Sequence, residues 1–538
     1  MNVSLKTLLA IGFLLLSGVM LFGRLGQYAL WDDESMTALG ATGVLGTGDT
    51  TAVHGGNVAA YREGLLLKNL HDRSTPPLAT YLAAVSLGVS GSNSGFAARL
   101  PFALIGLALM GVAVVLVGRI AHSSAESFIW YIAILGNVSL ILFLRQCRYY
   151  APAILLSVLI AYLYLRWRRS VWGLVLIALL ASLLFAANYM NCVALLVCMG
   201  LDYLIWKRRN DPLTPWQISI FAGLIGLPCL LVASVWNPLA TKFGSYTHAN
   251  SFWDRLTLVW WNLRDINEAG FLIAGLLLLA LYLAIFKKDH WMARGLTMII
   301  AYVAVISLVS PQLVHGAVQA DIRYLAPLIP FCIALGASAF NTQFRSRRTL
   351  ALVFALPVFW TNLLNGTCLP PQEVRSIPFE YFGELLSPPP EPYTSTAKWV
   401  NQYVPKGSTV WVLPDYAAYP LMFHAPEALY SWQLNPEQKQ DPQFKDLPDI
   451  HFKGVVLPYY IIVFGPMVVQ IRGMLQQWKQ QGADYEEIYR INTFWKDLYR
   501  PELFWRTFKP ITEFDPETQA IYIFKRTTPA TGAENIHK

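Results

Sequence analysis

The sequence has 538 residues, of which 55% are hydrophobic and only 14% are charged, and its mean hydropathy is +0.41. Soluble domains carry roughly 25% charged residues, so the composition excludes an ordinary soluble protein and predicts a polytopic α-helical membrane protein. The formal net charge of +8 does not point to nucleic acid, because Lys and Arg gather in short loops between apolar segments. The partner that these features predict is the lipid bilayer.

Eleven apolar segments approach the roughly 20 residues that cross a bilayer as a helix. They lie at 8–25, 96–118, 127–144, 149–165, 171–187, 190–206, 216–235, 268–286, 295–313, 324–340 and 349–366. No small-residue cleavage site follows the first segment, so we expect an uncleaved span. A further apolar segment, 77–89, has about 14 residues and suits a re-entrant or interfacial helix better than a span.

Loop charges predict the orientation. If 77–89 does not cross, the basic clusters 166–169, 207–209 and 345–348 all lie on one side, which is the cytoplasmic side because positive residues gather there. The amino terminus is then cytoplasmic and the carboxyl terminus is extracytoplasmic. We expect a multi-pass protein of the plasma (inner) membrane with its polar site on the outer or periplasmic face.

Three consecutive acids, Asp32, Asp33 and Glu34, follow the first apolar segment at that outer face. A carboxylate is costly at the boundary of a bilayer, although acids in a solvated loop would also explain the pattern. One carboxylate in contact with a substrate hydroxyl could act as a general base. Alternatively, neighbouring acids could bind a divalent cation such as Mg²⁺ or Mn²⁺; the sequence indicates no other cofactor.

Arginines on the same side supply the opposite charge. Arg145 and Arg148 are three residues apart at a predicted helix end, so we expect them to face one direction and to bind a lipid phosphate. Arg323 has the same character, although arginines also extend to the interface simply to reach water. The remaining candidates for substrate binding on this face are Tyr149, Tyr324, His71 and His315. Each histidine could alternatively be an acid–base group, a metal ligand or a polar loop residue.

The rest of the chain predicts an interfacial helix and a soluble domain. Apolar residues with many Trp recur at helical spacing over 253–266, as in a helix lying in the membrane interface. From 370 onward, Pro-rich segments predict an extended linker. Strands are expected at 408–413, 455–457 and 520–524 and helices at 396–403 and 467–481, which together predict an extracytoplasmic α/β domain. We therefore divide the chain into a membrane domain, 1–368, and an α/β domain, 369–538. The six cysteines show no CxxC spacing and predict neither a metal site nor a disulfide framework.

Five segments, taken in chain order, resemble the motifs of one enzyme family. Residues 31–38 resemble the first-loop acidic motif of GT-C glycosyltransferases that use polyprenyl-phosphate sugars, the group of protein O-mannosyltransferases and aminoarabinose transferases (glycosyltransferase families 39 and 83). Segments 75–82, 96–106, 146–151 and 323–327 are similar to the family's His/Lys-Pro-Pro-Leu, Arg-Leu-Pro-Ser-Ala-Leu-x-Gly, Glu-Ala-Arg-x-Tyr-Ala and Arg-Tyr-x-x-Pro motifs. Thr75 replaces the family's His or Lys, and Gln146 replaces its Glu.

The resemblance implies a GT-C fold and an inverting transfer of a sugar from a polyprenyl phosphate to an extracytoplasmic glycan, lipid or protein. Asp33 matches the family's base and Asp32 is an additional acid, while Glu34 would orient the base or the sugar. Arg148, Arg145 and Arg323 would stabilise the leaving phosphate. Two other classes stay open: a transporter or flippase of lipid-linked saccharides, and an inactive scaffold of the same fold.

Overall fold

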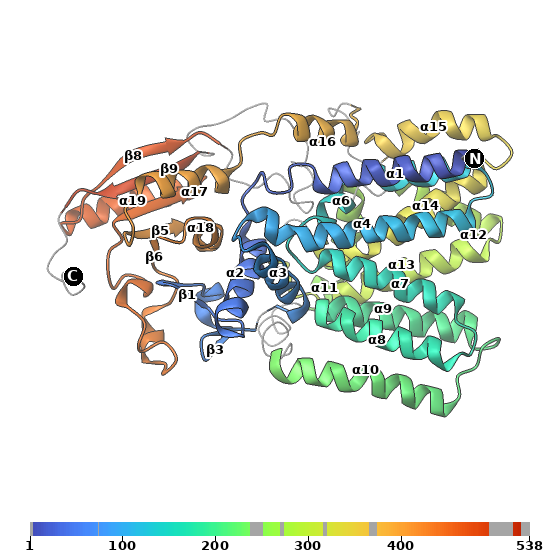
Figure 1. The fold of residues 1–538 in the computed structure, drawn as a ribbon, viewed down its shortest axis with the longest axis horizontal. Helices are drawn as coiled ribbons and strands as arrows, with labels where there is room; N and C mark the ends of the chain where they lie inside the picture. Colours follow the sequence, from blue (N-terminus) through green and yellow to red (C-terminus); the bar gives the residue numbers. More distant parts are fainter. Residues whose placement is uncertain are drawn as a thin grey trace.

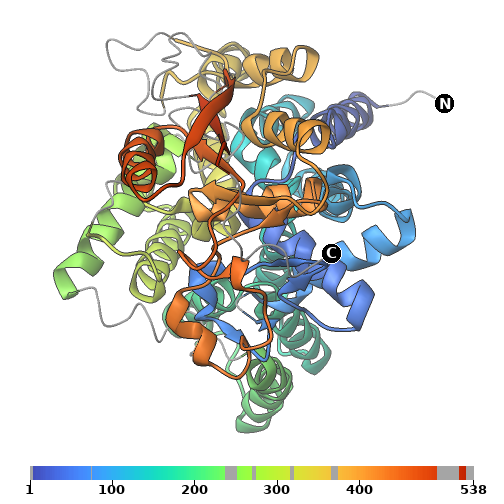
Figure 2. The same ribbon diagram turned by 90° about the vertical axis from the view of Figure 1, so that its left-hand side faces the viewer.

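The structure, a computed structural model, describes residues 4–73, 75–236, 251–269, 274–315, 320–364, 374–493 and 520–528. Long helices, among them α1, α4, α7, α8 and α10, run side by side through one part of the molecule (Figure 1). A mixed sheet with its own helices lies at one end of these helices, and the short helices α2 and α3 lie between the two parts (Figure 1). Figure 2 shows the sheet end in front of the helices.

The helical part matches the predicted apolar segments. Its helices are α1 (Leu5–Phe22), α4 (Gly95–Ile120), α5 (Ser124–Gly136), α6 (Val138–Leu144), α7 (Tyr150–Arg166), α8 (Val171–Ala187), α9 (Tyr189–Asp202), α10 (Pro215–Trp236), α12 (Ala274–Phe286), α13 (His290–Val309), α14 (Ile329–Gln343) and α15 (Arg348–Trp360). Within the described residues, 6 helices are long and apolar enough to cross a membrane, or up to 7 with one bent pair. The chain is therefore a multi-pass membrane protein, while the total of eleven spans stays a prediction.

The segment 127–144 is not the single straight span that its hydropathy predicts. It consists of α5 and α6, which meet at an angle of 64°. Asn137 ends α5 and caps α6, because its side chain accepts a hydrogen bond from the Leu140 amide at 2.8 Å. At Gly136 an added Cβ would overlap the carbonyl oxygen of Phe359, so only glycine lets α15 approach the bend this closely.

Two predicted short helices are present. The segment 77–89 forms α3 (Pro77–Ser90), and the Trp-rich segment forms α11 (Phe252–Ala269). On α11 the large apolar side chains are exposed, with Trp253 at 73% and Trp260 at 63%, whereas Asn262 and Asp265 are buried. Because a soluble helix would show the reverse arrangement, this pattern agrees with a helix whose outer face contacts lipid.

The segment after the acids is more ordered than the sequence indicates. Asp32 begins an unpredicted helix, α2 (Asp32–Thr47). Two small hairpins, β1 (Val53–His54) with β2 (Asn57–Val58) and β3 (Leu67–Lys68) with β4 (His71–Asp72), connect α2 to α3, with a short 3₁₀ turn at Tyr61–Gly64 between them. A second 3₁₀ turn at Ile322–Leu328 precedes α14.

The α/β domain contains a five-stranded sheet in the order β6-β5-β7-β9-β8. β6 (Leu429–Tyr430), β5 (Thr409–Leu413) and β7 (Tyr460–Phe464) are parallel, while β9 (Ile521–Arg526) is antiparallel to both β7 and β8 (Tyr485–Ile491). The helices are α16 (Ile377–Leu386), α17 (Pro392–Tyr403), α18 (Ala418–His424) and α19 (Met467–Gln480), with short 3₁₀ turns at Asp415–Ala417, Pro436–Gln440 and Asp449–His451.

Two predictions for this domain are wrong. Residues 455–457 form a turn and not a strand; Val455 is 46% exposed, and the buried strand β7 begins beyond Pro458, which cannot donate a main-chain hydrogen bond. The predicted linker also contains α16, whose Tyr381 packs against the membrane helices. The predicted domain boundary at 368 and 369 lies outside the described residues.

The α/β domain is fastened to the segment that precedes the acids. The Leu30 amide donates to His424 Nε2 of α18 at 2.9 Å, and the Ala29 amide donates to Thr394 Oγ1 of α17 at 2.8 Å. Asn57 adds a second connection, because it accepts from the Tyr430 amide at 2.7 Å. The sheet domain thus fixes the main chain from which the acidic motif begins.

Candidate active site

The three acids all lie in the first turn of α2, directly after the buried N-cap residue Trp31. The amino-terminal end of a helix favours negative charge, which explains why three carboxylates are tolerated here. Their surroundings differ: Glu34 is completely buried, whereas Asp32 and Asp33 are half-buried. Of the three, Asp33 is the acid held by arginines from two distant segments.

Asp33 Oδ2 accepts a hydrogen bond from Arg148 Nη2 at 3.2 Å and another from Arg323 Nη1. Arg148 Nη1 also donates to the Asp33 carbonyl oxygen at 3.1 Å and to Thr37 Oγ1 at 3.0 Å. Arg323 is oriented in turn by Asp321, whose Oδ2 accepts from Nε at 2.8 Å. Two guanidinium groups from distant segments therefore contact one carboxylate, and a carboxylate is a group that can act as a general base.

Unpaired polar atoms lie beside this cluster. In the described part of the chain, Arg148 Nε and the Tyr149 hydroxyl are buried and have no hydrogen-bond partner. The Tyr149 ring lies 5.7 Å from the Arg148 guanidinium, and the Tyr324 ring lies 5.5 Å from that of Arg323. Because buried polar groups are normally hydrogen-bonded, these donors indicate a place for a polar ligand.

Glu34 does not face that place. Arg99 donates to both of its carboxylate oxygens, at 2.8 and 2.5 Å, and the Cys147 amide donates to Oε1 at 2.7 Å. Arg99 also donates to the carbonyl oxygens of Leu25 and Tyr28, at 3.2 and 2.8 Å. Glu34 therefore holds together the segments that carry Asp33 and Arg148. Arg99 is the residue of this network that the sequence analysis missed, although it lies inside the 96–106 motif.

Arg145 is not beside Arg148, which corrects the prediction that the two face one direction. α6 ends at Leu144 and α7 begins at Tyr150, so helical spacing does not apply between the two arginines. Arg145 instead donates to the carbonyl oxygens of Met20 at 3.2 Å and Gly23 at 2.6 Å and to the Tyr381 hydroxyl. It connects the end of α1 to α16.

The remaining predicted site residues, His71, His315 and Asp32, have other surroundings than Asp33. His71, in β4, has Nδ1 2.6 Å from the Thr50 carbonyl oxygen and 3.7 Å from Asp49 Oδ2. His315 is exposed in the segment after α13. Asp32 lies toward α18, where burial, followed by the charges of nearby acids including Asp32, raises the pKa of Tyr419 well above its usual value.

The described residues do not form a set of ligands that fits the predicted divalent cation. No three or more His, Cys, Asp or Glu side chains in these parts of the chain come together as a metal site. Two guanidinium groups occupy the carboxylate of Asp33, and Asp321 is paired with Arg323. The role of Mg²⁺ or Mn²⁺ stays a prediction, and no chemical step is derived from it.

Comparison of the sequence with protein-family models and with curated proteins finds no match. Comparison of the structure does find similar folds, and these define the class: the chain has the fold of the GT-C glycosyltransferases. The fold class and the α/β domain expected from the sequence are thereby confirmed.

The solved structures with a similar fold include ArnT from Cupriavidus metallidurans; an oligosaccharyltransferase from Archaeoglobus fulgidus gives a lower score. ArnT bound to undecaprenyl phosphate is similar with a TM-score of 0.50 and 13% identity over 96% of this chain and 97% of that chain. Its apo state gives 0.51, with the same identity and coverage. The oligosaccharyltransferase, in complex with Zn and sulfate, gives 0.48 and 11% identity over 85% of this chain and 68% of that chain.

Proposed function

We propose that the protein is an inverting glycosyltransferase that moves a sugar from a polyprenyl-phosphate donor to a hydroxyl of an extracytoplasmic glycan, lipid or protein. The observation that carries the proposal is the contact of one half-buried carboxylate, Asp33, with the guanidinium groups of Arg148 and Arg323. The carboxylate can serve as a base, and the two guanidinium groups beside it can bind a phosphate through pairs of N–H donors. The similarity of the fold to ArnT, whose structure holds undecaprenyl phosphate, supports the donor class.

In the reaction, Asp33 accepts the proton of the acceptor hydroxyl while the oxygen of that hydroxyl forms a bond to the anomeric carbon. The bond from that carbon to the phosphate oxygen breaks on the opposite face, so the anomeric configuration inverts. The polyprenyl phosphate leaves with the electron pair of the broken bond. General-base assistance of this kind contributes about 10²–10⁴-fold to the rate.

Arg148 and Arg323 stabilise the charge that develops on the departing phosphate. The phosphate competes with Asp33 for the same guanidinium N–H groups, so binding of the donor frees the carboxylate to accept a proton. Asp321 keeps Arg323 oriented during this exchange. The unpaired Arg148 Nε and the Tyr149 hydroxyl supply further donors next to the same phosphate.

The test uses the purified, reconstituted protein with a polyprenyl-phosphate sugar as donor and an envelope extract as acceptor. Turnover is measured as the release of polyprenyl phosphate. Asp33→Asn keeps the shape of the side chain and removes the base, so turnover should fall about 100-fold or more while donor binding persists. Asp415→Asn is the matched control, because Asp415 pairs with Lys453 in the α/β domain at 2.9 Å.

Near-normal turnover by folded Asp33→Asn would overturn the assignment and make Asp32 the first alternative. Movement of intact donor across vesicles without formation of a glycosylated product would instead support the flippase reading. Absence of both activities, together with retained donor binding, would support the inactive scaffold.

A further inference from the structure

A cavity of about 720 Å³ opens among α4, α5, α7, α9, α13 and α14. Its volume lies within the roughly 300–1,000 Å³ that is usual for ligand sites. The residues that line it on α4 lie between Leu109 and Ile120. Arg99, near the beginning of the same helix, is instead paired with Glu34, the residue next to Asp33. The cavity therefore lies toward the opposite end of α4 from the Asp33 cluster.

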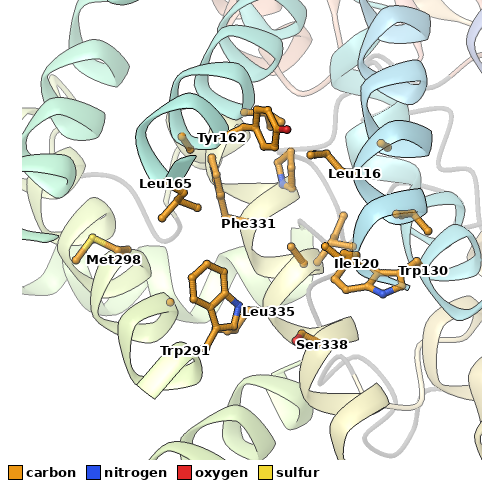
Figure 3. A pocket seen from close by; sticks show the side chains of 18 of the residues that line it. Leu116, Ile120, Trp130, Tyr162, Leu165, Trp291, Met298, Phe331, Leu335 and Ser338 are labelled. Carbon is orange, nitrogen blue, oxygen red and sulfur yellow. The ribbon is translucent and has the colours of Figure 1, made fainter. Parts of the chain in front are cut away.

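The walls of the cavity are apolar and aromatic. Figure 3 shows Leu116, Phe331 and Leu335 beside the central space, with Trp291 and Trp130 at its sides. These side chains come from different helices, so the space lies between helices and not within one groove. A wall of this kind excludes water and suits a hydrocarbon chain.

The rim of the cavity is strongly basic. Among the residues that the structure describes, its lining contains five arginines and two acids, which are Glu126 and Asp202. Glu126 is paired with Arg348 and Asp202 is paired with Arg294. The three arginines that have no acidic partner within the described chain are Arg119, Arg166 and Arg345.

Polar atoms without partners accompany this charge. In the described structure, Arg348 Nη1 and Asn341 Oδ1 are buried and make no hydrogen bond. Both residues line the cavity. Tyr162 lies between two of the basic side chains, with its ring 5.7 Å from the Arg119 guanidinium and 5.5 Å from that of Arg166. A ligand with acceptor oxygens would satisfy Arg348 and would match the excess positive charge.

We propose that this cavity binds an anionic phospholipid of the cytoplasmic leaflet, with its phosphate among the arginines at the rim and an acyl chain between the aromatic walls. Charge complementarity selects an anionic headgroup over a zwitterionic one, because the rim has three arginines more than it has acids. The position in the half of the membrane that the loop charges assign to the cytoplasm selects a lipid of that leaflet. The proposal does not depend on the glycosyltransferase activity, because the site is separate from Asp33.

Native mass spectrometry of the full-length protein tests the proposal with phosphatidylglycerol and phosphatidylcholine as probes. The wild-type protein should retain one phosphatidylglycerol with a preference of about tenfold or more over phosphatidylcholine, since hydrogen bonds to charged groups are strong. The double variant Arg119→Gln/Arg345→Gln should lose that preference. Arg168→Gln/Arg208→Gln is the matched control, because both side chains are exposed and neither lines the cavity.

A second variant separates the cavity from the general positive charge of that face. Ser338→Trp introduces a large side chain into the wall without changing the charge, and it should abolish retention of the lipid. Gel filtration and thermal melting confirm that each variant is folded. Equal retention of both lipids by the wild type, equal losses in the two double variants, or full retention by Ser338→Trp would overturn the proposal, as would displacement of phosphatidylglycerol by undecaprenyl phosphate.

Discussion

Arg99 and Glu34 form a two-pronged ion pair across 65 residues of sequence, with Arg99 Nε donating to Oε1 and Nη2 to Oε2. Glu34 has no exposed side-chain surface and Arg99 retains 11%. Arg99 also donates to the carbonyl oxygens that precede the acidic motif. One pair therefore fixes the start of α2 against α4, next to the carboxylate proposed as the base.

Removal of either charge should destabilise the protein. Glu34→Gln leaves the buried guanidinium of Arg99 without an ionic partner, and breaking a buried pair in this way costs about 3–5 kcal/mol. Thermal melting of the purified variant should show a large decrease in Tm. Glu427→Gln is the control, because Glu427 and Lys406 form an exposed pair at 56% and 81% exposure, and it should melt close to the wild type. An unchanged Tm for Glu34→Gln would contradict the structural role of the pair.

Arg148 and Arg145 should respond differently to substitution. Arg148→Lys keeps the charge but loses the forked contact, so it should weaken donor binding and turnover together, and Arg148→Ala should do so more strongly. Arg145→Lys should lower the Tm and leave the donor affinity of the folded fraction close to normal, because Arg145 holds main-chain carbonyls of α1. Titration of donor into folded protein distinguishes the two. Equal losses of affinity would show that both arginines bind phosphate.

The contact of His424 with Leu30 should fail in acid. Burial, with a smaller contribution from the nearby Arg99, lowers the pKa of His424 to about 4, below the usual value of 6.5 in the unfolded chain. The unfolded state binds the proton first, so stability is unaffected above pH 6.5 and decreases as the pH falls from 6.5 toward 4. The loss is at most about 3 kcal/mol.

Melting curves between pH 4 and 7.5 measure this dependence. His424→Gln supplies an amide oxygen that accepts from the Leu30 amide at every pH, so its Tm should vary less with pH than that of the wild type. His54, whose pKa burial also lowers to about 4, remains in both proteins and leaves a residual slope. If Tm depended on pH in the same way in both proteins, His424 would not be the cause of the loss of stability in acid.

The orientation predicted from loop charge is open to direct labelling. Single cysteines at Arg208 and at Lys406, both exposed, are introduced into a variant without native cysteines, and intact cells are treated with an impermeant maleimide. Label should reach position 406 from outside and position 208 only after permeabilisation. The opposite result would place the Asp33 cluster on the cytoplasmic side and would exclude an extracytoplasmic acceptor.

Hydropathy predicted the helical part well because each apolar segment must form a helix when its main chain has no water to bond. The same argument predicted α3 and the exposed Trp face of α11. It could not predict the bend at Asn137, because the bend depends on a side-chain cap and on the approach of α15 to Gly136. α16 was missed for a similar reason: a Pro-rich segment reads as a linker, and its contact with Arg145 is not local.

For the candidate site, the residue types were predictable and their partners were not. The acids and arginines on one face indicated Asp33 and Arg148, because a charged side chain near lipid is energetically unfavourable without an opposite charge beside it. Which arginine meets which acid depends on main-chain geometry between α6 and α7, where helical spacing wrongly grouped Arg145 with Arg148. The same spacing gave no reason to separate Glu34 from Asp33, although one is buried in an ion pair and the other is accessible.

The hydrogen bonds from Ala29 to Thr394 and from Leu30 to His424 connect residues 365 and 394 positions apart. The ribosome therefore delivers the acidic motif long before the groups that fix its main chain. A nascent chain that ends before the sheet domain lacks these bonds, and the main chain that enters α2 at Asp32 is then not held. The main chain that leads into the proposed active site is therefore expected to reach its final position only after the sheet domain has folded.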